Sequence, residues 1–374
     1  MPTHVRSYSK INLGLAIGPV RADGFHGLTT LYQTLDLHDL VTVSVRRLVS
    51  GETRIALTTN HPFVPKDERN TAWRMVEGCL TRLGVKAEVE IHIEKQLPVQ
   101  GGMGAGSANA AAALLGLERE LGMALPGVER LKLAAEIGSD VPLFLLGGAV
   151  LGLGRGEMVV PMPDLAKMWC VVAVPQVGVS TPAAFKAWDL RQEVCKDEGV
   201  EDGRGLTSVA KPDTLQELSL AYSSLSAKTG DSKPGTSGIV RDPNPEKKRD
   251  LPDESQADAM NDLAESTLLA LVRTGIGSDG LSGLHNDFED VVFPQYPSLR
   301  ITKRQLMGSD SDGSGVDRSA IYAALSGSGS ALFGLYRSEQ DAKAAQQRVQ
   351  SSGVQALLTE TLPRTEYWER MFAE

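Results

Sequence analysis

A run of glycines between a predicted strand and a predicted helix constrains the fold of this chain more than any other feature. Four of the six residues from 101 to 106 are glycine, which favours a backbone with positive φ or a close approach to a ligand. Before the run, residues 87–94 alternate apolar and polar side chains with the period of a strand. After it, residues 107–121 are rich in helix formers. We therefore predict a strand, a glycine loop and a helix, with Ser107 as the helix N-cap and Gly122 just past its end.

Such a loop suits an anion. Successive backbone N–H groups form a concave set of donors, and the following helix adds the positive end of its dipole. Two common nucleotide-binding motifs do not fit the spacing, because a P-loop requires lysine and a dinucleotide fingerprint requires glycine at the position of Ser107. A purely structural glycine turn remains the alternative.

Two other segments carry polar side chains that chemistry can use. In residues 10–17, apolar residues alternate with polar or small ones, so we expect a strand with one buried face and with Lys10 and Asn12 together on the other. A helix predicted over 128–137 ends in a turn that holds Asp140, because a proline two residues later stops the helix. On residue type alone, Asp140 is equally a turn former and Lys10 a solvated strand residue.

Length and charge limit the function classes. A chain of 374 residues is long enough for about two domains. The formal net charge of −9 gives no general positive field that would hold nucleic acid or an anionic membrane, so an anionic substrate would need a local site. No apolar leader is visible, and the longest apolar stretch, 141–153, is shorter than the roughly 20 residues of a spanning helix. The three cysteines form no C-x-x-C motif, which favours a reducing cytoplasm.

Two polar segments interrupt the predicted elements. Residues 187–259 contain a long run of Gly, Pro, Ser and charged residues, and 308–318 have the same character. Neither can bury enough apolar surface to offset the entropy of ordering. We expect both to be mobile insertions, and the sequence leaves open whether the longer one docks a partner. Residues 326–330 then lead into a predicted strand over 331–336.

The segment PVQGGMGAGSANAA, residues 98–111, resembles the phosphate loop of the GHMP kinases, the superfamily of galactokinase, homoserine kinase and mevalonate kinase. Three further segments resemble one branch of it, which phosphorylates a cytidine diphosphate-linked polyol in non-mevalonate isoprenoid synthesis: SKINLGL at 9–15, RADGFH at 21–26 and IGSDVPLFL at 137–145. LSGSGSALF, at 325–333, is similar to the superfamily's third motif. The two polar insertions lie outside the resemblance.

The resemblance implies an α+β fold of two domains with the active site in the cleft between them. Residues 1–165 would form the N-terminal domain, with the ATP loop and the catalytic pair, and residues 166–374 the C-terminal domain, which completes the substrate pocket. It also implies ATP and Mg²⁺ as cofactors. Because the sequence shows no His, Cys, Asp and Glu cluster at ligand spacing, the metal would be held mostly by ATP phosphates and water.

By the same resemblance, Asp140 takes the proton from the substrate hydroxyl, and Lys10 keeps that carboxylate ionised and stabilises the developing charge. Phe25 and Phe185 would stack on the two faces of the cytosine base, and His26 would hydrogen-bond its edge. Asn12 completes the expected substrate-binding set. For the aromatic residues and His26, the alternatives are ordinary core and turn residues.

The remaining expected site residues bind ATP. Asn70 and Lys95 would lie at the adenine side, although both are equally surface residues by sequence. The expected phosphate-loop residues are Pro98, Val99, Gln100, Gly101, Gly102, Met103, Gly104, Ala105, Gly106, Ser107 and Ala108. Gln100 and Ala105 stand where glycine is usual in the family, Ala108 where serine is usual, and Phe25 where tyrosine is frequent.

Two functional alternatives remain open. The chain could be another GHMP kinase, acting on mevalonate, homoserine or a sugar, but RADGFH and Phe185 argue against this. It could instead be a non-catalytic nucleotide-binding regulator with the same fold, which the presence of both Lys10 and Asp140 disfavours.

Overall fold

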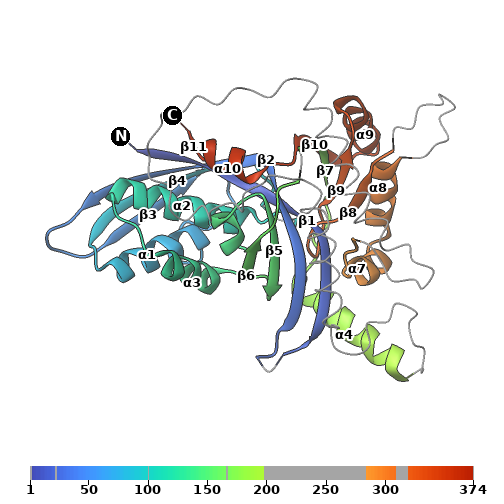
Figure 1. Ribbon diagram of the computed structural model, residues 1–374, viewed down its shortest axis with the longest axis horizontal. Coiled ribbons are helices and arrows are strands. Elements are labelled where there is room, and N and C mark those ends of the chain that lie inside the picture. The colour runs from blue at the N-terminus through green and yellow to red at the C-terminus, as the bar shows by residue number, and fades with distance from the viewer. Residues whose placement is uncertain are drawn as a thin grey trace.

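The computed structural model describes residues 2–21, 23–99, 101–165, 167–197, 284–308 and 319–373, without the side chains of 194–197. Gln100 and most of the two predicted insertions lie outside the described residues. The described chain forms two β-sheets, each packed against its own helices (Figure 1). None of the helices in these ranges combines the length and apolar character needed to cross a membrane.

The first sheet contains seven strands: β1 (Thr3–Val20), β2 (His26–Arg47), β3 (Arg54–Thr59), β4 (Ala87–Glu94), β5 (Ala149–Gly154), β6 (Met158–Pro161) and β11 (Phe372–Ala373). β1 and β2 form a long antiparallel hairpin. One part of β2 pairs with β4, to which β3 is parallel, and the part nearer the hairpin turn pairs with β5, which pairs with β6. β11 adds to the outer edge of β1.

The second sheet is antiparallel throughout and has the order β10 (Gln355–Glu360), β7 (Trp169–Val174), β9 (Leu332–Tyr336) and β8 (Tyr322–Leu325). Its side chains and those of β1 share a core that includes Ile11, Leu13, Val172 and Phe333. The β1–β2 hairpin is therefore the part of the first sheet that packs against the second sheet (Figure 1).

Helices cover both sheets. Those of the first half are α1 (Thr71–Leu83), α2 (Ala105–Leu121), α3 (Gly127–Ile137) and the short 3₁₀ helix η1 (Pro142–Leu145); those of the second are α4 (Thr181–Asp197), α7 (Glu289–Gln295), α8 (Pro297–Met307), α9 (Glu339–Ser351) and α10 (Arg364–Glu369). α2 packs on β1 and β2 beside α1, which also contacts α3, whereas α8 and α9 pack on the second sheet (Figure 1).

Several predicted elements are confirmed. The strand over 87–94 is β4, the helix over 128–137 is α3, and 331–336 contains β9. Gly122 ends α2 with φ of 60°. The predicted start of that helix is wrong, because α2 begins at Ala105 with Gly104, at φ of 70°, as its N-cap. Glycine reaches this left-handed φ without strain, so the helix begins before Ser107.

The expectation of a single buried face over residues 10–17 is also wrong. Ile11 and Leu13 are fully buried, but Lys10 and Asn12 on the polar side are each only 2% exposed. The strand has no solvent face because the core shared with the second sheet covers one side and the glycine loop lies against Lys10 on the other.

The predicted start of the longer insertion, at residue 187, is wrong as well. α4 continues to Asp197. Ala184 and Trp188 are spaced one helical turn apart and are 3% and 8% exposed, in the same core cluster as Val291 of α7. This apolar spacing carries the helix beyond the predicted boundary.

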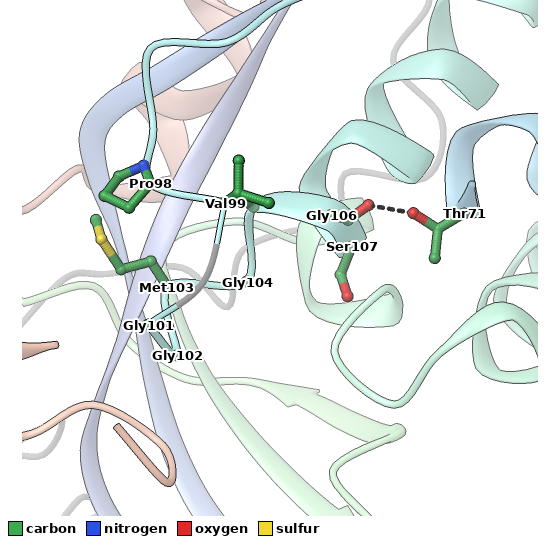
Figure 2. Close-up of a pocket in the computed structure, with 10 residues that line it drawn as sticks. Thr71, Pro98, Val99, Gly101, Gly102, Met103, Gly104, Gly106 and Ser107 are labelled. Atoms are coloured by element: carbon green, nitrogen blue, oxygen red, sulfur yellow. Dashed lines mark hydrogen bonds between the residues drawn. The ribbon is translucent and has the colours of Figure 1, made fainter. Parts of the chain in front are cut away.

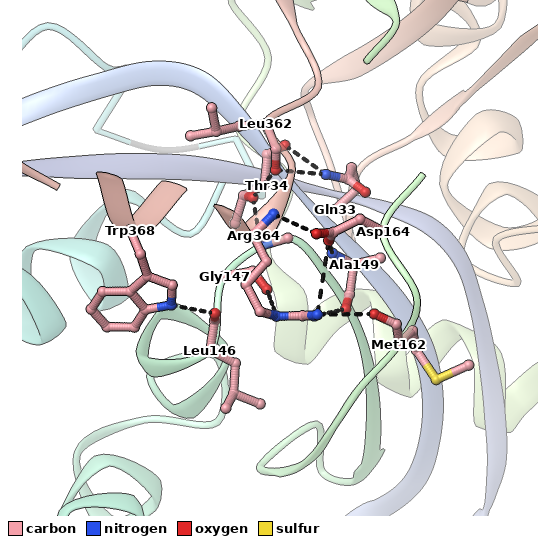
Figure 3. A network of polar contacts seen from close by, with 11 residues as sticks. Gln33, Thr34, Leu146, Gly147, Ala149, Met162, Asp164, Leu362, Arg364 and Trp368 are labelled. Carbon is pink, nitrogen blue, oxygen red and sulfur yellow. Dashed lines mark hydrogen bonds and ion pairs between the residues drawn. The ribbon is translucent and has the colours of Figure 1, made fainter. Parts of the chain in front are cut away.

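The C-terminal residues return to the first sheet (Figure 3). Arg364 donates hydrogen bonds to the carbonyls of Gly147, Ala149 and Met162 at 3.1, 2.6 and 3.1 Å. The Trp368 indole N–H donates to the carbonyl of Leu146, the C-cap of η1, at 2.9 Å. The predicted division of the chain after residue 165 remains a prediction, and residues 362–373 pack with the first half of the chain.

Candidate active site

The glycine turn lines a cavity of about 230 Å³ at the start of α2 (Figure 2). The cavity is bounded by Thr71, Pro98, Val99 and residues 101–107. The first backbone bond within α2 runs from Ala108 N to Gly104 O at 2.9 Å. The backbone N–H groups of residues 105–107 therefore have no acceptor inside the helix, and with the positive end of the helix dipole they suit an anion.

Glycine is required in this turn for steric reasons. Gly101 and Gly102 have φ of 127° and 82°. A Cβ on Gly102 would lie 2.1 Å from the carbonyl oxygen of Ser326, a distance at which no side chain fits. Ser326 Oγ also donates to Gly102 O at 3.0 Å, and Ala331 N donates to Gly101 O at 3.1 Å. The motif at residues 325–333, which belongs to the second sheet, therefore holds the glycine turn in place through these hydrogen bonds.

Lys10, Asn12 and Asp140 meet beside this turn. Lys10 Nζ lies 3.3 Å from Asp140 Oδ2 and donates to Asn12 Oδ1 at 2.7 Å. The Lys10 side chain is 3% exposed, whereas that of Asp140 is 31% exposed and open to a substrate. Lys10 N donates to Met103 O at 3.1 Å, and a Cβ on Gly104 would lie 3.2 Å from Lys10 Cε. The structure thus brings the predicted pair and the predicted phosphate loop into direct contact.

Tyr32 joins this group and was missed by the sequence analysis. Its hydroxyl donates to Asp140 Oδ1 at 2.9 Å. Burial, followed by the neighbouring Asp140 carboxylate, raises the pKa of Tyr32 well above its usual value of 10. Tyr32 lies opposite Asn12 in the register of the hairpin. The sequence pattern of a single strand does not reveal which residues of the next strand it faces, so no signal in the sequence pointed to Tyr32.

The expected base-binding residues are only partly brought together. The rings of His26 and Phe185 are stacked, with centroids 5.1 Å apart and planes 6° apart. His26 Nδ1 donates to Gly18 O at 2.9 Å, and its Nε2 lies 3.0 Å from Asp189 Oδ1. Phe25 does not face Phe185 among the ring contacts of the described residues, but is 53% exposed.

A cation covers the Phe25 ring. The guanidinium carbon of Arg155, in the turn between β5 and β6, lies 5.0 Å from the ring centroid. Because Phe25 is in the hairpin turn between β1 and β2, this contact joins the two turns.

The two residues expected at the adenine side have their polar atoms engaged within the protein. Asn70 caps α1 by accepting a hydrogen bond from Ala72 N at 2.9 Å. Lys95 forms an ion pair with Asp39, which has no exposed side-chain surface. The alternative that they are surface residues is wrong, because Asn70 is 7% exposed and the Lys95 side chain 4% exposed. Contact with adenine remains a prediction.

A buried polar segment that leads into the first turn of α7 also supports the site and was missed. Asn286 Nδ2 donates to Leu325 O and to Gly327 O, each at 2.8 Å. Glu289 Oε1 accepts from Leu325 N at 2.8 Å. These contacts hold the residues that lock the glycine turn. The signal was the segment HNDFED, polar at every position except its phenylalanine, directly before the apolar VVF.

Metal ligands do not form a cage in the described part of the chain, where no three His, Cys, Asp or Glu side chains converge as a metal site requires. The Thr71 hydroxyl donates to Gly106 O at 2.7 Å, as Figure 2 shows, and Ser107 lines the cavity. The cavity therefore presents backbone groups and hydroxyls to a ligand.

Comparison with known protein families identifies the class of protein to which this chain belongs. Residues 70–148 match the GHMP kinases N terminal domain, and residues 261–355 match the GHMP kinases C terminal domain. These matches give the protein the fold of a GHMP kinase, an α+β fold of small-molecule phosphotransferases, and the glycine turn at the head of α2 lies within the first of them.

Comparison with individual proteins identifies the family within this class. A 4-diphosphocytidyl-2-C-methyl-D-erythritol kinase of Nocardioides sp. is 37% identical over 236 residues, which cover 63% of this chain and 80% of the relative. An enzyme of the same name from Alkaliphilus metalliredigens is 28% identical over 98% of both chains. The protein belongs to the 4-diphosphocytidyl-2-C-methyl-D-erythritol kinase family.

A solved structure agrees at the level of the fold. The crystal structure of a 4-(cytidine 5'-diphospho)-2C-methyl-D-erythritol kinase superposes with a TM-score of 0.59 at 23% identity, covering 96% of this chain and 99% of that chain.

Proposed function

We propose that the protein transfers the terminal phosphoryl group of ATP to the 2-hydroxyl of 4-diphosphocytidyl-2-C-methyl-D-erythritol, a step of non-mevalonate isoprenoid precursor synthesis. The observation that carries this proposal is the contact of the Lys10–Asp140 pair with the glycine turn. One exposed carboxylate lies next to a loop built for phosphate, at the place where an alcohol and a phosphoryl group would meet. Family membership supplies the substrate.

Asp140 acts as the general base. An ionised carboxylate only accepts hydrogen bonds, and the Lys10 ammonium at 3.3 Å favours that ionised form. The proton of the 2-hydroxyl passes to Asp140, the hydroxyl oxygen bonds to the terminal phosphorus, and ADP leaves with the bridging oxygen. Lys10 also stabilises the charge that develops on the transferred group. The chain's main task is alignment.

The cavity fits the phosphate chain of ATP. Its lining of glycine backbone and helix N–H groups binds phosphate without a basic side chain. The hydroxyls of Thr71 and Ser107 lie in the same lining. Mg²⁺, when bound to the phosphates, would neutralise charge on their oxygens, and few protein ligands are needed for it because it keeps most of its water.

An assay with a substrate panel tests the proposed function. The purified protein is incubated with ATP, Mg²⁺ and 4-diphosphocytidyl-2-C-methyl-D-erythritol, or with mevalonate, homoserine or galactose in its place. We expect one ADP per phosphorylated cytidine substrate and no turnover above blank with the others. ADP formation with one of the other acceptors alone would identify a different GHMP kinase, and binding of ATP without any turnover would identify a regulator.

Replacing Phe25 tests the cytidine side separately. Phe25→Ala removes an exposed aromatic surface, and loss of base stacking, about 1–3 kcal/mol, is expected to raise KM for the cytidine substrate about tenfold or more. KM for ATP should not change. Ile301→Ala, which truncates an equally exposed apolar residue on α8 (55% against 53%), serves as the control and should leave both KM values unchanged. An unaltered cytidine KM in Phe25→Ala would remove Phe25 from the substrate site.

A further inference from the structure

Tyr32 is a buried group at the candidate active site that the mechanism above does not use. It is 2% exposed. Its hydroxyl donates to Asp140 Oδ1 at 2.9 Å, while Lys10 Nζ lies 3.3 Å from the other oxygen, Oδ2. The same ammonium is 5.4 Å from the centre of the Tyr32 ring. The two oxygens of the carboxylate therefore have different partners, one neutral donor and one cation.

Two glycines shape the space that Tyr32 occupies. A Cβ on Gly152, in β5, would lie 2.5 Å from Tyr32 Cε2, and a Cβ on Gly156, in the turn after β5, would lie 2.4 Å from the Tyr32 hydroxyl oxygen. Any larger residue at either position would displace the phenol. The turn after β5 is thus built around the hydrogen bond between Tyr32 and Asp140.

We propose that Tyr32 is a positioning residue for phosphoryl transfer, whose hydroxyl fixes the Asp140 carboxylate through Oδ1 so that Oδ2, beside Lys10, faces the hydroxyl to be phosphorylated. This inference rests on the proposed function. A donated hydrogen bond also favours the charged form of a carboxylate. Since burial raises the pKa of Tyr32 well above 10, the phenol remains a donor throughout the neutral range.

The titratable and charged groups around the hydrogen bond between Tyr32 and Asp140 come from β1, β2 and the turn before β6. Lys10 is on β1 and Tyr32 on β2. Glu157, just before β6, is close enough for its charge to raise the pKa of Tyr32 further. Removal of the Tyr32 hydroxyl takes away the hydrogen bond to Oδ1 of Asp140 and leaves the ion pair of Oδ2 with Lys10.

Tyr32→Phe tests this role directly. We expect kcat to fall about 10- to 100-fold, as for loss of a hydrogen bond to a charged group, with KM for both substrates changed less than about twofold. The acid side of the kcat–pH profile should move to higher pH. Tyr336→Phe is the matched control, because this buried phenol in the second sheet donates to Leu306 O at 2.8 Å. It should lower thermal stability without moving the profile.

Two further measurements separate positioning from folding. Tyr32→Phe added to Asp140→Asn should cause no further loss of kcat, because residues that act through one another are not additive. Gly156→Ala, which displaces the Tyr32 hydroxyl without removing it, should move the pH profile in the same direction as Tyr32→Phe. A Tyr32→Phe enzyme with the wild-type profile, or an equal loss in the Asp140→Asn background, would overturn the proposal.

An activity-independent readout keeps this inference distinct from the proposed function. The ¹³C carboxyl signal of Asp140, assigned by its absence in Asp140→Asn, is followed against pH in the protein without substrate. Its midpoint should lie at higher pH in Tyr32→Phe than in the wild type, and an unchanged midpoint would refute the inference. Failure of the kinase assay alone would leave this test in force.

Discussion

Asp140→Asn is expected to lower kcat about 10³- to 10⁴-fold, at the upper end of what a general base contributes. The amide has nearly the same shape but cannot accept the proton of the substrate hydroxyl. Because the glycine turn binds the phosphates through its backbone, the dissociation constant of ATP should remain within about twofold of the wild-type value. Single-turnover kinetics and calorimetric titration with a non-hydrolysable ATP analogue measure the two quantities.

Asp341→Asn provides the comparison for that variant. Asp341 lies in the first turn of α9, a helix that packs on the second sheet, and accepts a hydrogen bond from Ser338 at 2.6 Å. Asp341→Asn therefore removes a carboxylate that has no role in the proposed reaction. It should retain wild-type kcat. If Asp140→Asn kept kcat within tenfold, another group would have to be the base, and if it lost ATP binding instead, Asp140 would act on the nucleotide.

Gly102→Ala is expected to abolish productive nucleotide binding. The new Cβ would lie 2.1 Å from Ser326 O, a backbone atom, at a φ of 82°, so either the turn or the third motif must shift. Backbone strain of this kind costs about 1–3 kcal/mol before any clash. KM for ATP should therefore rise by about 100-fold, or ATP binding should be undetectable. Steady-state kinetics and titration with ATP provide the measurement.

Gly122→Ala is the control for Gly102→Ala. It shows how much of the effect comes from replacing any glycine with a left-handed backbone and how much from the clash in the glycine turn. Gly122 has φ of 60° at the other end of α2, and its Cβ would meet nothing within 4 Å. We expect a loss of about 1 kcal/mol of stability with an unchanged KM for ATP. Normal ATP binding by Gly102→Ala would show that the turn does not hold the phosphates.

Local patterns in the sequence were sufficient to predict the elements that carry the site. The alternation over 87–94, the glycine run and the helix formers after it gave strand, turn and helix, because each depends on neighbours in the chain. The helix start was misplaced since the cap is a glycine in left-handed conformation, and glycine also fits within the loop. A family resemblance predicts the roles of Lys10 and Asp140, but their 3.3 Å contact depends on tertiary structure.

The residues that sequence reasoning missed act through contacts between distant segments. Tyr32 reaches Asp140 because of the hairpin register, and Asn286 reaches Gly327 because α7 starts at the end of β8. The burial of Lys10 was not predicted for the same reason, as its strand is enclosed by a second sheet formed later in the chain. Hydrophobic periodicity reports on one element at a time and does not reveal such enclosures.

The return of residues 362–373 to the first sheet also affects how the protein is made. The ribosome synthesises β1 to β6 long before Arg364 and β11. Until then, the three carbonyls that accept hydrogen bonds from Arg364 lack this donor, and the outer edge of β1 lacks its partner strand. Pairing between residues almost a whole chain apart is slow, because the entropy cost of closing the loop must be met before the non-local contacts stabilise it. The nascent first half therefore presents an open strand edge, the kind of surface on which chaperones act and at which stalled or truncated chains aggregate.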